Sequence, residues 1–464
     1  MFDYILSLVY AAFGIGVFFY FLNVYRIHKY TKELHASLVP MAHLRNLAFR
    51  LRKPLPKFAI FVPARNEGDV IANTIGNLEA IEYPKNKYCV CIVVDERELD
   101  DRVEARTKDV VSSLAQKLNS QYGTDFLQCL EIPKWYSGIF QSQEKTYEKS
   151  TKGRALNYAL QCLAANPQWS SFDMIGILDA DGRLHPNVLK EAAQKRLEKD
   201  AKLLQGPVYQ ITNFSKVSLV GIAAGLELAV HHMTELPDRL RPGNKLQFLA
   251  GTNYFIDKNL IAEVGGWNQH ALVEDAELAL RLYAEKRICG HWLNVVEQEQ
   301  TPPSFAVYRK QRERWARGHL TLLGYILKSN IPFGEKVVLF HQILRSQYRA
   351  FFDFGLPIFA LVLMLSGALR NVGPFFTVLS LLLVAATPFL WDLYGFMYRQ
   401  IASSIDPDIQ TKQKLVMSAK LFLFVPVFII VQAIPRIEAL YNHFFRHQQM
   451  EWYKTVRTKE IATT

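Results

Sequence analysis

The chain has 464 residues, half of them hydrophobic, and Lys plus Arg exceed Asp plus Glu by 54 − 43 = 11. This length is more than one small domain needs and is sufficient for a soluble core together with membrane segments. The basic excess collects beside apolar stretches and accompanies no nucleic-acid-binding motif. We therefore exclude nucleic acid as a partner and expect anionic membrane lipids instead. The five cysteines form no zinc-type pair, so we expect reduced thiols on the cytoplasmic side.

A nearly uncharged run covers residues 4–25. At about 1.5 Å per residue it can cross a hydrocarbon layer of about 30 Å, which predicts a transmembrane helix within residues 1–25. A cleaved signal peptide is the alternative, disfavoured because no basic segment precedes the run and no small-residue cleavage site follows it. The basic membrane-proximal linker, residues 26–54, begins with Arg26, His28 and Lys29, which favours the cytoplasmic side.

Three further apolar stretches, residues 354–369, 374–396 and 419–434, predict a transmembrane region over residues 354–440. Before it, residues 321–353 are predicted to form interfacial helices, because Arg345 and Arg349 stand among apolar and aromatic neighbours. One span before the polar region and three after it would place the C-terminus outside. The basic tail, residues 441–464, favours the inside, so the span count stays open. We expect a multi-pass protein of the cell (plasma) membrane with a cytoplasmic polar domain.

The polar region, residues 55–320, alternates short β-branched runs with helical stretches, which predicts an α/β fold with a mainly parallel sheet. Three apolar runs, KFAIFVPA, YCVCIVVD and MIGIL, read as strands that each end in polar residues. Ligands of open α/β sheets bind at the carboxyl ends of strands. The residues expected to converge there are Asn66, Glu67, Asp95, Asp179 and Asp181.

Each acidic motif has a functional and a structural interpretation. Asp179-x-Asp181 suits Mg²⁺ or Mn²⁺ on a substrate phosphate, or it is a turn that bends at Asp181-Gly182. Asp95 can accept hydrogen bonds from a nucleobase or ribose, or simply close a strand. Asp275, in Val273-Glu274-Asp275, can serve as a general base or cap the helix that follows.

The cationic motif Gln311-Arg312-Glu313-Arg314-Trp315 reads as helical, with Arg312 and Trp315 on one face. Arg side chains bind diphosphates and Trp rings stack on sugars. A basic juxtamembrane helix with an interfacial Trp is the alternative.

The four motifs, in this order, resemble the membrane-integrated family-2 glycosyltransferases, which include the synthases of cellulose, chitin, hyaluronan and poly-N-acetylglucosamine. The resemblance covers about residues 55–320. Further matches are Pro63-Ala64-Arg65-Asn66-Glu67, Lys152-Gly153-Arg154-Ala155-Leu156-Asn157, Gly251-Thr252-Asn253-Tyr254-Phe255 and Gly265-Gly266-Trp267.

The resemblance implies a GT-A fold that binds a UDP-sugar with Mg²⁺ or Mn²⁺ and inverts the anomeric centre in one displacement. It implies a metal site at Asp181 and Asp179, and a catalytic base at Asp275 beside Glu274. The substrate-binding residues that it implies are Asn66, Glu67, Asp95, Lys152, Asp179, Gln311, Arg312, Arg314 and Trp315.

Three positions qualify the match. Asp95-Glu96-Arg97-Glu98 stands where the family usually has an Asp pair followed by Ser or Asp, so no role carries over to Glu96. Val273 replaces the common Thr of a Thr-Glu-Asp triplet. The tail segment from Glu451 to Arg457 resembles the Trp-x-x-Thr-type gating segment of some synthases, or is only a basic tail.

The leading expectation is a processive enzyme that extends a β-linked polysaccharide, because the Gln-x-x-Arg-Trp motif is typical of such synthases. Four spans are few for a polymer tunnel, so a small membrane subunit or a homo-oligomer is an expected partner. The first alternative is transfer of a single sugar to a membrane lipid acceptor. The second is a non-catalytic membrane binding protein built on a transferase fold.

Overall fold

The structure, a computed structural model, describes residues 54–100, 105–137, 150–167, 171–239, 249–350, 392–399 and 408–446, with single positions between 361 and 402 and at 455–459. The predicted N-terminal span and linker, and most of the two predicted spans between 354 and 396, lie outside the described residues. The described residues form two compact units. The sheet unit contains residues up to Lys216, Glu235–Pro303 and the tail positions, and the helical unit contains Val217–Thr234 and Ser304–Gln449.

The sheet unit alternates strands and helices along the chain. Its strands are β1 (Phe58–Ala64), β2 (Tyr88–Asp95), β3 (Leu127–Ile132), β4 (Met174–Ile177), β5 (Arg183–Leu184), β6 (Leu203–Gln205), β7 (Val208–Gln210), β8 (Tyr254–Asp257), β9 (His291–Trp292) and β10 (Glu297–Glu299). Its helices are α2 (Ile71–Glu79), α3 (Thr107–Tyr122), α4 (Lys152–Ala165), α6 (Val188–Lys199), α8 (Lys258–Glu263) and α9 (Glu274–Lys286).

The central strands are buried on both faces, which explains why their sequences are continuous apolar runs rather than alternating ones. In β1, Phe58 and Ile60 pack into one apolar core, whereas Ala59 and Phe61 pack into the other. In β2, both Cys89 and Cys91 face the second core, and both are free thiols.

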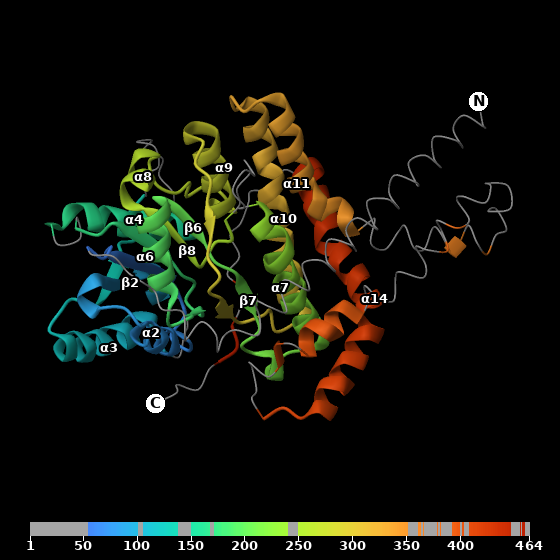
Figure 1. Cartoon of the computed structure of the whole chain (residues 1–464), viewed down its shortest axis with the longest axis horizontal. Helices are drawn as coiled ribbons and strands as arrows, with labels where there is room; N and C mark the ends of the chain where they lie inside the picture. The colour runs from blue at the N-terminus through green and yellow to red at the C-terminus, as the bar shows by residue number, and fades with distance from the viewer. Residues whose placement is uncertain are drawn as a thin grey trace. The chain divides into compact units, whose positions relative to one another are not determined.

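Helices cover both faces of the larger sheet, so the unit has three layers. Side chains of α2, α3 and α6 contribute to the first core, and side chains of α4, α8 and α9 contribute to the second. Figure 1 shows α2 and α3 on one side of β2, and α4 and α8 on the other.

The larger sheet has seven strands in the order β3-β2-β1-β4-β8-β6-β9. β1 pairs in parallel with β2 and β4, whereas β8 is antiparallel to β4 and β6. The predicted α/β class with a mainly parallel sheet is confirmed. Because β2, β1 and β4 are parallel neighbours, the loops after their carboxyl ends meet at one edge of the sheet. That edge carries the polar residues expected to converge.

A smaller sheet of three strands has the order β5-β10-β7. β5 begins directly after the Asp179-x-Asp181 turn and pairs antiparallel with β10, where Glu297 lies opposite Leu184. β10 therefore delivers two acidic residues, Glu297 and Glu299, to the loop that follows β4.

The helical unit consists of α10 (Phe305–Lys328), α11 (Phe333–Ala350), α14 (Thr411–Tyr441) and most of α7 (Leu219–Arg239). α10 packs against both α11 and α14. The end of α10 and the whole of α11 lie within residues 321–353, whose place at a membrane interface stays a prediction. The Gln311 to Trp315 motif lies on α10, as its spacing indicated.

Within the described residues, one helix is long and apolar enough to cross a membrane, Thr411–Arg446. Its mean hydropathy reaches 2.2, and only 22% of the apolar window is buried. It contains residues 419–434, one of the three apolar stretches in the predicted transmembrane region. Its exposed side chains include Leu415, Leu423, Val427 and Ile430.

Candidate active site

Asp95 closes β2 and is held in place by a buried arginine. Arg154, in the first turn of α4, donates from Nη1 to Asp95 Oδ2 at 2.8 Å, and both side chains are almost fully buried. Arg154 also donates to the carbonyl oxygens of Tyr136 and Pro133, so its orientation is fixed. Arg154 therefore fixes the carboxylate of Asp95 at the carboxyl end of β2.

The loop after β1 places Asn66 and Glu67 at the same edge. Asn66 adopts a positive φ of 56°, which Asn tolerates better than most residues. Its backbone N–H donates to Glu98 Oε1 at 2.7 Å. The backbone N–H of Glu67 donates to Thr107 Oγ1 at 2.8 Å, and the Glu67 side chain is buried. Two side chains from the next crossover, between β2 and β3, therefore fix this loop.

Lys152, at the first position of α4, connects two parts of the site. Its ammonium donates to Asp179 and, at 2.8 Å, to the carbonyl oxygen of Gly251. Burial would lower its pKa, but Asp179 and Glu274 outweigh burial and hold the pKa above its ordinary value. Lys152 is therefore a stable positive charge between the Asp-x-Asp turn and the start of α9.

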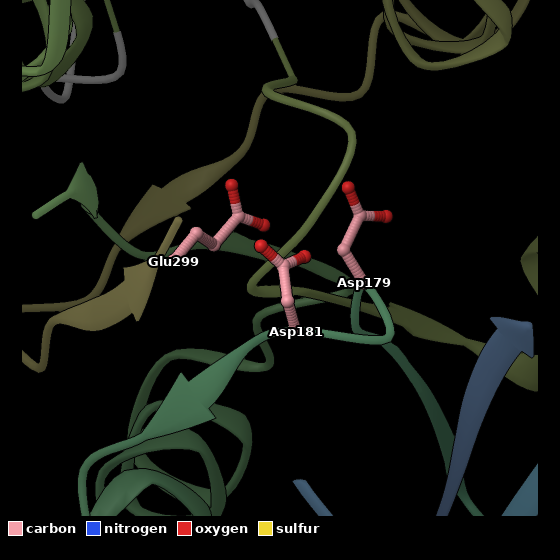
Figure 2. Close-up of side chains that lie close together, drawn as sticks. All are labelled: Asp179, Asp181 and Glu299. Carbon is pink, nitrogen blue, oxygen red and sulfur yellow. The ribbon is translucent and has the colours of Figure 1, made fainter. Parts of the chain in front are cut away.

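Asp179, Asp181 and Glu299 form a carboxylate cluster, with one oxygen of each lying within 4.8 Å of the others. Figure 2 shows the two aspartates on the loop after β4 and Glu299 entering from a different strand, with the carboxylates turned toward a shared space. The bend predicted at Asp181-Gly182 is present too, because Gly182 N donates to Asp179 O at 2.9 Å. The structural and functional interpretations of this motif are compatible.

The cluster has the chemistry of a divalent cation site. Oxygen ligands suit Mg²⁺ and Mn²⁺. Glu299 Oε1 is buried and accepts no hydrogen bond within the described residues, and the buried Asp181 Oδ1 has an ion-pair contact with Arg457 but no well-aligned hydrogen bond there. Burial and the neighbouring Asp181 raise the pKa of Glu299 to about 8. Burial also raises the pKa of Asp181, against the opposing effect of Arg457. Buried carboxylates at this spacing need positive charge, which a metal ion would supply.

Hydrogen bonds from neighbouring residues fix the carboxylate cluster in place. Thr252 donates from Oγ1 to Glu297 at 2.8 Å and accepts from the backbone N–H of Asp179 at 3.0 Å. Gln300 N donates to Asp181 Oδ2 at 2.9 Å. Burial, with the nearby Glu299 and Asp179, raises the pKa of Glu297 well above its ordinary value. The Asp-x-Asp turn is thus fixed by Thr252, which precedes β8, and by Gln300, which follows β10.

Asp275 is the second residue of α9, and Val273 occupies the N-cap position without a side-chain cap. Asp275 therefore does not cap the helix, although its place in the first turn suits the helix dipole. A Cβ on Gly251 would lie 3.2 Å from Asp275 Oδ2, and Gly251 has a φ of +82° that favours glycine. Asp275 thus lies against the Gly251 turn whose carbonyl oxygen binds Lys152.

The remaining matched motifs have structural roles. Asn157 exchanges hydrogen bonds with the backbone of Trp267, each at 2.8 Å. A Cβ on Gly266 would lie 2.4 Å from Asn157 Oδ1, so this position requires glycine. Trp267 Nε1 donates to Tyr254 OH at 2.8 Å. Glu96 accepts from the backbone N–H of Lys134 at 2.8 Å, which gives it a local role outside the cluster.

The C-terminal tail reaches the same carboxylates. Arg457 Nη2 lies 2.8 Å from Asp181 Oδ1 and 4.0 Å from Asp179 Oδ2. Burial opposes its charge, but Asp181, Glu67 and Glu299 hold the pKa of the guanidinium above its ordinary value. The sequence alone indicated only a basic tail or a gating segment at this position.

In the helical unit, Arg312 and Trp315 share one face of α10, as predicted. The Arg312 guanidinium lies 4.4 Å from the Trp315 ring centre and 5.2 Å from the Tyr308 ring centre. Arg312 is also 3.6 Å from Glu227, which accepts from Arg436 at 2.9 Å. Gln311 is buried, and Gln311 and Arg314 lie on the same helix.

Sequence reasoning found most of the acidic residues at the sheet edge but missed four contributors. Arg154 belongs to the matched motif from Lys152 to Asn157, but the spacing of that motif does not predict its ion pair with Asp95. Glu297 and Glu299 belong to none of the matched motifs. Gln300 follows them directly and reaches Asp181 through its backbone.

Comparison with known proteins decides the class of enzyme. Residues 174–391 match the family model described as glycosyl transferase family group 2. A probable glycosyltransferase, YdaM of Bacillus subtilis, is 24% identical over 408 residues, which cover 87% of this chain and 88% of the relative. The beta-monoglucosyldiacylglycerol synthase of Synechocystis is 25% identical over 411 residues, which cover 87% of this chain and 75% of the relative. The chain is a glycosyltransferase, and residues 174–391 are similar to family group 2.

A solved structure also aligns with this glycosyltransferase. It is a mannosyltransferase from Pyrobaculum calidifontis in complex with GDP-Man and Mn²⁺, with 15% identity, 91% coverage of this chain, 99% of its own and a TM-score of 0.47. The enzyme class predicted from the motif order is confirmed. The α/β sheet unit, with its Asp-x-Asp turn after β4, is the GT-A domain that the family implies.

Proposed function

We propose that this glycosyltransferase transfers a sugar from a nucleotide sugar, a UDP-sugar, to a membrane lipid, with inversion at the anomeric carbon. The leading expectation from sequence was a polysaccharide acceptor. One observation favours the lipid: the relative from Synechocystis, which is similar along 87% of this chain, is named as a synthase of glucosyldiacylglycerol. The exposed apolar side chains of α14 support contact with lipid.

The donor would bind at the carboxyl edge of β2, β1 and β4. Asp95, fixed by Arg154, would accept hydrogen bonds from the uridine, and the loop that carries Asn66 and Glu67 would line the same site. Lys152 would place its charge beside the diphosphate. Asp179, Asp181 and Glu299 would hold Mg²⁺ or Mn²⁺, which when bound stabilises the charge that develops on the leaving diphosphate.

Asp275 would act as the general base. The acceptor hydroxyl attacks the anomeric carbon while its proton passes to the Asp275 carboxylate. The bond from that carbon to the diphosphate oxygen breaks, and its electron pair leaves with the nucleoside diphosphate. Lys152 contacts Asp179 and the Gly251 turn beside Asp275, which supports a single connected site. Glu274 is buried beside Asp275 and favours the charged form of Lys152.

The roles of Gln311, Arg312, Arg314 and Trp315 in binding the diphosphate and the acceptor sugar remain predictions from the family resemblance. Arg312 already stacks on Trp315, so we assign it to the orientation of that ring. The six-part domain division and a multi-pass arrangement in the cell membrane, with the sheet unit on the cytoplasmic side, also remain predictions.

The test is an assay of membranes that contain the full chain with a panel of UDP-sugars, Mg²⁺ or Mn²⁺, and vesicles that contain diacylglycerol. We expect one donor to yield a discrete glycolipid, together with release of UDP that depends on the lipid. A long polymer without a glycolipid would restore the polysaccharide function. Failure of every donor would favour the binding-protein alternative.

A further inference from the structure

Arg457 places a guanidinium among the carboxylates that we assign to the metal ion. Its side chain is only 14% exposed, and it lies 2.8 Å from Asp181 Oδ1. Glu67 and Glu299 contribute to the same negative surroundings. A positively charged side chain therefore neutralises the cluster from the tail of the same chain.

The arrangement of the oxygens on Asp181 makes this contact competitive with metal binding. Asp181 Oδ2 accepts from Gln300 N at 2.9 Å, so Oδ1 is the oxygen left for a cation. Arg457 contacts that oxygen. On Asp179, Oδ1 already accepts from Lys152, and Arg457 is nearest to Oδ2. A divalent ion and the guanidinium would need the same carboxylate oxygens, and their like charges repel at close range.

The segment around Arg457 is docked through specific hydrogen bonds. Gln300 Oε1 accepts from both N and Oγ1 of Thr458, at 2.7 and 2.8 Å, and Gln300 Nε2 donates to the Thr458 carbonyl at 2.9 Å. Asn213 Nδ2 donates to Thr458 Oγ1 at 3.3 Å. Gln300 thus holds both the tail and Asp181, which connects the position of the tail to the cluster.

We propose that Arg457 and a divalent metal ion compete for Asp181 Oδ1, so that docking of the tail and loading of the metal are alternative states. Metal binding would release the segment Arg457–Lys459 from the sheet edge, and loss of the metal would return it. The inference rests on the metal-binding part of the proposed function. In this inference, Arg457 of the tail controls access of the metal ion to the carboxylate cluster.

The test measures Mn²⁺ affinity calorimetrically for the full chain in detergent, and so needs no sugar donor. Arg457→Gln should bind Mn²⁺ at least about tenfold more tightly. In the wild type, only molecules with the tail undocked can bind the ion, and a small undocked fraction lowers the apparent affinity in proportion. Thr458→Val, which weakens docking without touching the carboxylates, should change affinity in the same direction. Lys117→Gln removes an exposed positive charge on α3 and should bind like the wild type.

Hydrogen exchange of the tail gives an independent readout. Deuterium uptake at residues 455–459 should rise when Mn²⁺ is added to the wild type. Equal or weaker Mn²⁺ binding by both variants, or uptake that stays constant or falls, would overturn the competition and leave the proposed function intact. A wild type that binds no Mn²⁺ would overturn both the competition and the metal site.

Discussion

Buried charge pairs fix the positions of single side chains at this sheet edge. Arg154 is 0% and Asp95 3% exposed, and three separate acceptors hold the guanidinium. A buried pair adds little net stability, but removal of one partner is costly because the other charge remains buried. Asp95 could be predicted as a strand-end ligand from its position after an apolar run. Arg154 could not, since nothing in its spacing identifies which acid it meets.

Arg154→Met should therefore destabilise the protein by about 3–5 kcal/mol, measured by thermal unfolding. Lys108→Met is the matched control, because Lys108 and Glu131 form a pair with side chains 47% and 34% exposed. The control should change stability by about 1 kcal/mol or less. Equal melting temperatures for the two variants would show that Asp95 does not depend on Arg154.

Gly251→Ala should lower the rate of sugar transfer at least about tenfold, since correct placement of a catalytic group accounts for much of a rate enhancement. The added Cβ would meet Asp275 Oδ2 at 3.2 Å, and φ of +82° disfavours alanine. Gly76→Ala on α2 is the control, because nothing lies within 4 Å of its Cβ. It should keep the wild-type rate and gain up to about 1 kcal/mol of stability. An unchanged rate in Gly251→Ala would show that the position of Asp275 does not depend on this turn.

At the scale of elements, Glu227 links three helices of the helical unit. It lies on α7, accepts from Arg436 of α14 at 2.9 Å and lies 3.6 Å from Arg312 of α10. Tyr308 OH donates to it at 3.3 Å. The orientation of Trp315 follows from this network, because Arg312 stacks on its ring.

Glu227→Gln keeps the shape of the side chain but leaves two guanidinium groups without their shared counter-charge. We expect a loss of about 3 kcal/mol in stability, measured by thermal unfolding in detergent. Glu438→Gln, which breaks the more exposed pair with Arg309, should cost about 1 kcal/mol or less. The Glu227 network would be structurally unimportant if the two variants unfolded at the same temperature.

Long apolar strands could be predicted from sequence, but very short ones could not. β1, β2 and β4 end where the sequence places their polar residues. β5 has two residues and β10 has three, which is too short for a periodic pattern. Glu297 and Glu299 belong to β10, so they were missed even though β10 completes the acidic cluster.

At the scale of the whole molecule, α14 gives the clearest sign of membrane attachment. Leu423 is 75% exposed on this apolar helix, and only 22% of the apolar window is buried. Exposed leucine on a helix of this length is costly in water and favourable in a bilayer.

Single cysteines test this assignment in a background in which all five native cysteines are replaced by serine or alanine, since every free thiol reacts once the chain is denatured. In intact membranes, Leu423→Cys should resist an aqueous maleimide, whereas Lys412→Cys, near the start of α14, should react. Both should react after solubilisation and denaturation. Rapid labelling of Leu423→Cys in intact membranes would place this part of α14 in water.

Contacts between distant parts of the chain were the least predictable. Arg457 was interpretable only as a basic tail or a short gating match, because its contact with Asp181 depends on how the tail folds back. The lipid acceptor that we propose was also beyond the motifs, since the Gln-x-x-Arg-Trp pattern favoured a polymer, whereas the relative from Synechocystis is named as a glucosyldiacylglycerol synthase. The order of the motifs along the chain predicted the enzyme class, although the Gln311 to Trp315 motif lies in the helical unit and the other motifs lie in the sheet unit.

The most direct test of the account compares Asp275→Asn with the wild type in transfer of the sugar to the lipid acceptor. With Asp275 as the general base, the variant should lose about 100- to 10,000-fold in transfer rate while its dissociation constant for the donor stays unchanged. Asp125→Asn, an exposed loop variant, should keep the wild-type rate. Retention of more than about a tenth of the wild-type rate by Asp275→Asn would contradict the proposed chemistry.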